Sequence, residues 1–142
     1  MIMGVDPGLA STGIAILDGL SVVYRATVKT TKAEADADRC RAIARAVVEA
    51  VELMPCAVWI EDYEFQGAAR TGNRNAIRMA RLVGWIAGAT DGRLVSRNTW
   101  GRALGVKNDA QQRARLSQLT GERLHNAHER DAACVAIYGA RR

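Results

Sequence analysis

Two short apolar segments of this chain each end in an acidic residue, and this pairing constrains the fold more than any other feature. The first segment, MIMGV, stops at Asp6, which precedes a Pro-Gly pair typical of a turn. Residues 57–60 (AVWI) are continuously apolar, as in a central strand covered on both faces, and Glu61 follows them. We therefore predict two central strands that bring Asp6 and Glu61 to one edge of a sheet, where α/β proteins bind ligands.

The segments after Asp6 predict an antiparallel meander. Residues 12–17 and 20–28 have strand-like compositions, and the Asp18-Gly19 pair between them is a strong hairpin signal. Together with the segment that ends at Asp6, they give three consecutive strands joined by tight turns.

Helices dominate the rest of the chain. Thr31 and Glu34 fit a capping box for a helix that stops before Pro55, and Asn126 with Glu129 fits a second one. Helices are also expected over residues 74–90, 98–105 and 109–119, and a fifth strand over residues 93–97. The resulting order, β-β-β-α-β-α-β-α-α-α, predicts one α/β domain over residues 1–142, with a five-stranded mixed sheet flanked by helices.

A metal site is the chemistry that these acidic residues suggest. Asp131 begins an alanine-rich helix and lies three residues after His128, so both side chains share one helical face. A carboxylate at the end of an apolar strand is costly to bury unless a cation or a donor meets it. Together with Asp6 and Glu61, Asp131 predicts an oxygen-ligand site for Mg²⁺, with Mn²⁺ as a substitute.

Each of these residues also has an ordinary structural interpretation. Asp6 could cap its own turn, and Glu61 could be a solvated strand end. His128 and Asp131 could simply belong to the first turn of a helix, where acidic residues favour the helix dipole. Their joint placement at the ends of the most apolar segments favours the metal site.

The positive charge is concentrated in the middle of the chain. The whole sequence has 20 Lys and Arg against 15 Asp and Glu, whereas residues 70–115 alone hold 10 basic and 2 acidic residues. A basic block between acid-containing ends predicts a surface that meets a polyanion such as DNA; a solvated Arg-rich face is the alternative. The candidate phosphate-binding residues are Arg70, Arg74, Arg78 and Arg81, which form one stripe, and Arg102.

Two further features of the helical segments have open interpretations. Ala80, Gly84 and Gly88 form a stripe of small residues that would let another helix approach closely, either in the core or in a dimer. Trp100 lies beside basic residues, where it could stack on a base or be buried at a helix start.

Taken in order, the motifs resemble a known family. IMGVDPG followed by Thr12-Gly13, then VWIE ending at Glu61, then the His128-x-x-Asp131-Ala-Ala motif resemble the RuvC-type Holliday-junction resolvases, particularly their compact bacteriophage members. The stretch from Asn98 to Gly105 (NTWGRALG) and the following Arg-x-Arg pair are similar to the phage pattern as well.

This resemblance implies an RNase H-like fold, a homodimer, and Mg²⁺-dependent nicking of two opposed strands at a four-way DNA junction. It implies that Asp6, Glu61 and Asp131 are metal ligands, and His128 falls where many members have a fourth carboxylate. Lys107 falls near a basic residue that faces the scissile phosphate in the family. The family's aromatic wedge could correspond to Tyr63 or Phe65.

Other functions stay open at this stage. The same site would serve an RNase H-like nuclease that acts on flaps or RNA–DNA hybrids, and the same fold would serve an inactive junction-binding module. Sugar-kinase and actin-like ATPases share the first hairpin but need a second domain. Three scattered cysteines and the lack of a signal peptide or a long apolar run predict a cytoplasmic protein with reduced thiols and no membrane segment.

Overall fold

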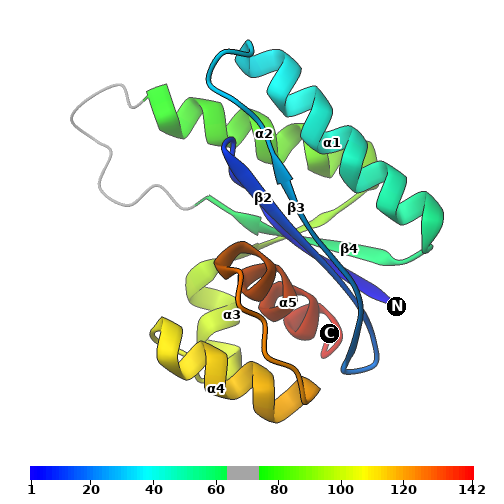
Figure 1. The fold of residues 1–142 in the computed structure, drawn as a ribbon, viewed down its shortest axis with the longest axis vertical. Coiled ribbons are helices and arrows are strands. Elements are labelled where there is room, and N and C mark those ends of the chain that lie inside the picture. The colour runs from blue at the N-terminus through cyan, green and yellow to red at the C-terminus, as the bar shows by residue number, and fades with distance from the viewer. Residues whose placement is uncertain (64–73) are drawn as a thin grey trace.

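A five-stranded mixed sheet lies at the centre of the protein, as predicted (Figure 1). The computed structural model describes residues 1–63 and 74–142. The strands run in the spatial order β3-β2-β1-β4-β5, in which β1, β2 and β3 pair antiparallel, whereas β1–β4 and β4–β5 pair parallel. Their bounds are Ile2–Asp6 (β1), Ser11–Asp18 (β2), Ser21–Lys29 (β3), Ala57–Asp62 (β4) and Arg93–Ser96 (β5).

Helices cover both faces of this sheet and create two apolar cores. On one face, α1 (Asp36–Leu53) and α2 (Arg74–Thr90) pack against side chains such as Met3 and Val5 of β1. On the other face, α5 (Ala127–Gly139) lies against the sheet, with α3 (Arg97–Leu104) and α4 (Asp109–Thr120) around it. The alternation of side chains along β1 and β2 divides them between these two cores.

The packing of α5 on the sheet depends on two glycines. A Cβ atom added at Gly4 would lie 1.9 Å from the carbonyl oxygen of Ala132, and one at Gly13 would lie 2.1 Å from that of His128. The backbone of α5 therefore rests directly on the backbones of β1 and β2. This close approach carries His128 and Asp131 to the end of β1, where Asp6 lies.

Several predicted helix starts differ from those observed. The Thr31–Glu34 capping box is wrong, because the N-cap position of α1 is Ala35, which makes no side-chain cap hydrogen bond. The backbone N–H and the hydroxyl of Thr31 both donate to the Glu34 carboxylate, in a turn that precedes the helix. Helix α3 is capped by Ser96 rather than by Asn98.

Asn126 does cap α5, since its side chain accepts from the backbone N–H groups of His128 and Glu129. The predicted reciprocal bond from Glu129 is wrong, because its carboxylate accepts instead from the Thr27 hydroxyl of β3 at 2.9 Å. Contacts to the sheet thus override the local capping pattern.

The helices and the cysteines show neither a membrane span nor a disulfide within the described residues. In the described ranges, the helices are all too short or too polar to cross a bilayer. Cys40, Cys56 and Cys134 are free thiols, and burial raises the pKa of the Cys134 thiol to about 12.

The glycine contacts make a direct prediction about stability. Gly4→Ala should lower the free energy of unfolding by about 1–3 kcal/mol or more, because the new methyl group must displace the backbone of α5. Gly88→Ala, at a position of α2 where the added methyl group meets open space within one chain, should instead raise the free energy of unfolding of the monomer by roughly 1 kcal/mol. Urea unfolding of both variants measures these changes, and equal effects at the two positions would contradict the close contact.

Candidate active site

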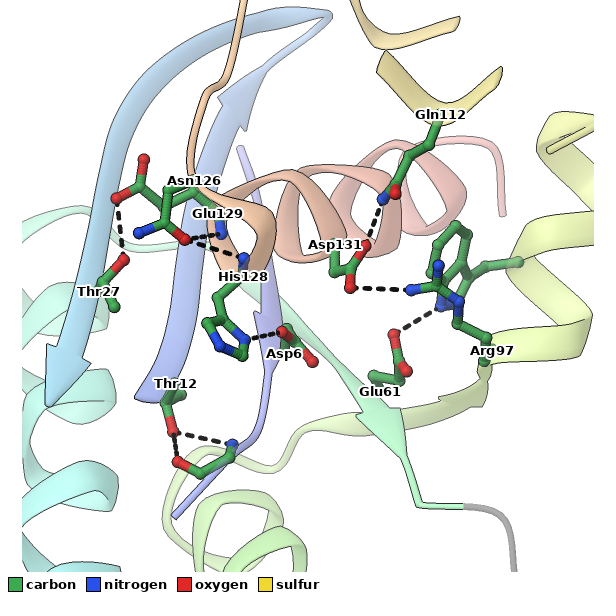
Figure 2. A network of polar contacts seen from close by, with 12 residues as sticks. Asp6, Thr12, Thr27, Glu61, Arg97, Gln112, Asn126, His128, Glu129 and Asp131 are labelled. Carbon is green, nitrogen blue, oxygen red and sulfur yellow. Dashed lines mark hydrogen bonds and ion pairs between the residues drawn. The ribbon is translucent and has the colours of Figure 1, made fainter. Parts of the chain in front are cut away.

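Four predicted site residues come together at one edge of the sheet. Asp6 ends β1, and Glu61 lies near the end of the neighbouring parallel strand β4. Helix α5 supplies Asp131 and His128 from above this edge. Figure 2 shows the three carboxylates turned toward a common region, although they come from distant parts of the chain.

Helices on that face supply donors to each carboxylate. His128 Nδ1 lies 2.7 Å from Asp6 Oδ2, and Trp100 Nε1 donates to Glu61 Oε2 at 2.9 Å. Arg97 forms a 2.9 Å ion pair with Asp131 Oδ2, whereas the Gln112 amide donates to the other oxygen of Asp131. The carboxylates are thus held in place by α3, α4 and α5 (Figure 2).

Burial and neighbouring charge both raise the proton affinity of the acidic groups at this edge. Burial raises the pKa of Glu61 to about 7, and the neighbouring Asp6 charge acts in the same direction. Burial also raises the pKa of Asp6, although its hydrogen bond with His128 opposes this. The same hydrogen bond raises the pKa of His128. The site therefore binds positive charge, either protons or cations, more strongly than isolated carboxylates would.

Arg97 links this edge to a neighbouring basic region. A cavity of about 170 Å³ opens at the carboxylates and is lined by Asp6, Glu61 and Arg97, among others. Another cavity, of about 300 Å³, is lined by Arg97 together with Arg102 and Lys107. The predicted residues Arg102 and Lys107 therefore lie beside the carboxylate cavity rather than within its lining.

The donor chemistry of the site fits a hard divalent cation. Asp6, Glu61 and Asp131 offer carboxylate oxygens, the ligands that Mg²⁺ prefers, and their crowding leaves a negative charge for a cation to offset. In the described part of the chain, no three His, Cys, Asp or Glu side chains are already arranged as a metal-binding cluster. One oxygen of Asp6, one of Glu61 and both of Asp131 are instead held by His128, Trp100, Arg97 and Gln112.

Three residues of this site were missed or left open by the sequence reasoning. Trp100 is fully buried with its N–H on Glu61, so the buried interpretation is confirmed and base stacking is wrong. Gln112 and Arg97 were not identified. Arg97 had a usable signal, since it directly follows β5, the third parallel strand that reaches this edge. Gln112 had none, because only the packing of α4 on α5 brings it near.

Only part of the predicted arginine stripe is available to contact DNA phosphates. Arg74 and Arg81 are exposed on α2, but Arg78 forms a 2.5 Å ion pair with Asp36 of α1, which lowers the pKa of that carboxyl. Arg78 therefore joins the two helices. Arg70 and Phe65 lie outside the described residues, and Tyr63 lines the carboxylate cavity.

Comparisons with solved structures identify the fold. The chain is similar to Thermus thermophilus RuvC in complex with a Holliday junction substrate, with 22% sequence identity, a TM-score of 0.78, and coverage of 98% of this chain and 91% of that one. A second Thermus thermophilus RuvC structure gives 21% identity and the same TM-score, and covers 98% and 92%. No protein-family profile and no curated protein sequence matches the chain. The protein thus has the RNase H-like fold of RuvC.

The raised pKa values predict that the metal-free protein loses stability as the pH rises. The folded state holds a proton on Glu61 between pH 4.5, its ordinary pKa, and about 7, whereas the unfolded chain has released it. The raised pKa values of Asp6 and His128 have the same sign. Urea unfolding with a chelator should show a loss on the order of 2 kcal/mol across this range.

Glu61→Gln is the matched variant for this measurement. It keeps the shape of the side chain but removes its titration, so the pH dependence should become shallower. A wild-type stability that rises between pH 5 and 7 would contradict the raised pKa of Glu61.

Proposed function

We propose that the protein is a metal-dependent, structure-selective DNA endonuclease that resolves four-way junctions by paired nicks. The observation that carries this proposal is the meeting of Asp6, Glu61 and Asp131 at the ligand-binding edge of the sheet. The fold supports it, because a RuvC structure of the same fold contains a Holliday junction substrate. We propose that the enzyme acts on branched DNA in the cytoplasm.

In this proposal Asp6, Glu61 and Asp131 hold the Mg²⁺ or Mn²⁺ ions. His128 is either a fourth metal ligand or the residue that orients Asp6. Bound ions would supply the activation of an attacking water and the compensation of charge at the leaving oxygen. Hydrolysis would form a bond between the water oxygen and phosphorus and break the bond from phosphorus to the 3′-oxygen, and the proton lost by the water would be matched by one gained by the 3′-oxygen, which gives a 5′-phosphate and a 3′-hydroxyl. Trp100 and Gln112 fix the orientations of Glu61 and Asp131.

Arg97 has a distinct role in the proposed reaction. Its guanidinium stacks 4.5 Å from the Trp100 ring centroid and pairs with Asp131, so it holds a permanent positive charge against the carboxylates. If Asp131 held a metal ion, this ion pair would weaken and Arg97 would be free to contact a phosphate. Lys107 and Arg102, in the adjoining cavity, extend this positive surface along the DNA, and the exposed Arg74 and Arg81 add to it.

The outer face of α2 supports a homodimer. Ile77 and Trp85 are 52% and 43% exposed, and Ala80, Gly84 and Gly88 are exposed beside them. Cβ atoms added at either of these glycines would meet open space, so the stripe packs against nothing within the described chain. A second copy would cover this apolar face, and two active sites would match two opposed nicks.

The nuclease proposal is tested by cleavage of labelled substrates. Four-way junctions, flaps, plain duplex and RNA–DNA hybrid should be incubated with Mg²⁺, with Mn²⁺ and with a chelator. We expect paired cleavage of the junction that requires a divalent ion. Asp6→Asn, Glu61→Gln and Asp131→Asn should each reduce cleavage to background while leaving junction binding intact, because each removes a negative charge that holds metal.

Glu129→Gln is the matched control on α5, since its carboxylate bonds to Thr27 rather than to the site. It should retain cleavage. Preferred cutting of flaps or hybrids would replace the proposed substrate, and binding without cleavage under any metal would indicate a junction-binding module.

The dimer makes a separate prediction. Light scattering should give twice the chain mass of 15.4 kDa for the wild type at micromolar concentration. Trp85→Glu should shift this toward the monomer, because it buries a charge in the proposed interface. Leu20→Glu, at a residue 42% exposed in the β2–β3 turn, should not. A monomeric wild type would remove the dimer from the proposal.

A further inference from the structure

We propose that a basic cavity beneath α4, separate from the carboxylate edge, binds a phosphate group of a nucleic-acid chain. This inference rests on the proposed action on DNA and deepens it by assigning a second anchor. The cavity has a volume of about 410 Å³ and lies between α4, the segment that follows it, and α5. It is lined by Arg113, Ala114, Leu116, Ser117, Arg123, Leu124, His125 and Arg130.

The lining of this cavity is strongly cationic. The lining contains three guanidinium groups, from Arg113, Arg123 and Arg130. It also contains the hydroxyl of Ser117 and the imidazole of His125. The lining residues in the described chain include neither Asp nor Glu. All of the polar side chains can donate hydrogen bonds, and three positive charges in one cavity repel one another unless an anion offsets them. The cavity is thus complementary to an oxyanion.

Arg130 supplies the buried part of this charge. Its side chain is only 5% exposed, and the nearest carboxylate, that of Asp109, lies 3.7 Å away and is 66% exposed. Nη1 donates to the carbonyl oxygen of His125 at 2.7 Å and to that of Leu124 at 3.5 Å, while Nε has no hydrogen-bond partner within the described residues. Because these carbonyl groups are neutral and the carboxylate of Asp109 is exposed, the buried guanidinium leaves a positive potential in the cavity.

Phosphate on a nucleic-acid chain is the anion that best fits these features. The guanidinium fork binds phosphate oxygens in pairs, and arginine is the preferred residue for this interaction. Ala114, Leu116 and Leu124 add an apolar floor that can take a sugar or base beside the phosphate. The volume falls within the range of roughly 300–1,000 Å³ that small-ligand sites occupy, so one nucleotide unit fits.

The cavity and the catalytic edge lie on different sides of the same two helices. On α4, Gln112 reaches Asp131, whereas the next residue, Arg113, lines the cavity. On α5, Asp131 faces the carboxylates, whereas Arg130 lines the cavity. Consecutive helical residues diverge by about 100°. The cavity therefore anchors nucleic acid without touching the reacting phosphate.

The test compares two double variants in junction binding without divalent metal. Arg113→Ala with Arg123→Ala removes the exposed arginines of the cavity, and Arg25→Ala with Arg45→Ala removes two exposed arginines from β3 and α1. The cavity variant should bind a four-way junction several-fold more weakly and lower the salt slope by about 1, because the cavity neutralises one phosphate and each neutralised phosphate contributes about 0.9 to that slope. The control variant should match the wild type, and thermal unfolding confirms that both variants fold.

NMR of the arginine Nε–Hε groups identifies the occupant independently of cleavage. Titration with single-stranded DNA in a chelator should shift the signals of Arg113, Arg123 and Arg130. Inorganic phosphate and a 5′-phosphorylated dinucleotide serve as the free-anion arms and should bind more weakly than the DNA. A cavity that responds to free phosphate but not to DNA would overturn the proposal, as would a salt slope unchanged in the cavity variant.

These outcomes separate this inference from the nuclease proposal. If the protein cleaves junctions but the cavity variant binds them as the wild type does, only the cavity assignment fails. If cleavage is absent with every metal but the cavity variant weakens DNA binding, only the nuclease proposal fails.

Discussion

The direct packing of the α5 backbone on the backbones of β1 and β2 is the constraint on which the rest of the structure depends. Gly4 and Gly13 permit it, because any side chain at either position would collide with carbonyl oxygens of α5. With side chains at these two positions, α5 would lie farther from the sheet, and Asp131 would stand farther from Asp6 and Glu61. The close packing at Gly4 and Gly13 in the core thus determines how near Asp131 lies to Asp6 and Glu61.

Bringing those acidic groups together has an electrostatic cost, and the surrounding residues show how the fold offsets it. Each carboxylate keeps a donor from a helix: His128 for Asp6, Trp100 for Glu61, and Arg97 with Gln112 for Asp131. Even so, burial, helped by the neighbouring Asp6 charge, raises the pKa of Glu61 to about 7. This uncompensated cost supports the proposed cation site, because a bound cation would offset the crowded negative charge.

The sequence predicted the parts of this arrangement that are local in the chain. The apolar runs before Asp6 and Glu61 located two strand ends, and their parallel pairing placed both residues at one edge. The features that escaped prediction depend on tertiary contacts: Gln112 reaches Asp131 across two helices, and Glu129 leaves its capping position to bond Thr27. Arg78 is similar, because its place in an arginine stripe gave no indication of its ion pair with Asp36. Arg97 lay between these cases, since it was predicted as the last residue of the fifth strand, whereas that strand ends at Ser96 and Arg97 begins α3.

Helices α4 and α5 each place adjacent residues in two different sites, the carboxylate edge and the basic cavity. Gln112 and Asp131 belong to the carboxylate edge, while Arg113 and Arg130, their neighbours in sequence, line the basic cavity. This division keeps Arg113 and Arg130 from forming ion pairs with the carboxylates of the candidate site, which would compete with the proposed metal ions for the same oxygens. Arg97 differs, because it does pair with Asp131 and lines both the carboxylate cavity and the cavity beside it. In the proposed function it is therefore the residue through which metal binding and phosphate binding at this edge would be coupled, whereas the lining of the cavity beneath α4 includes none of the three carboxylates.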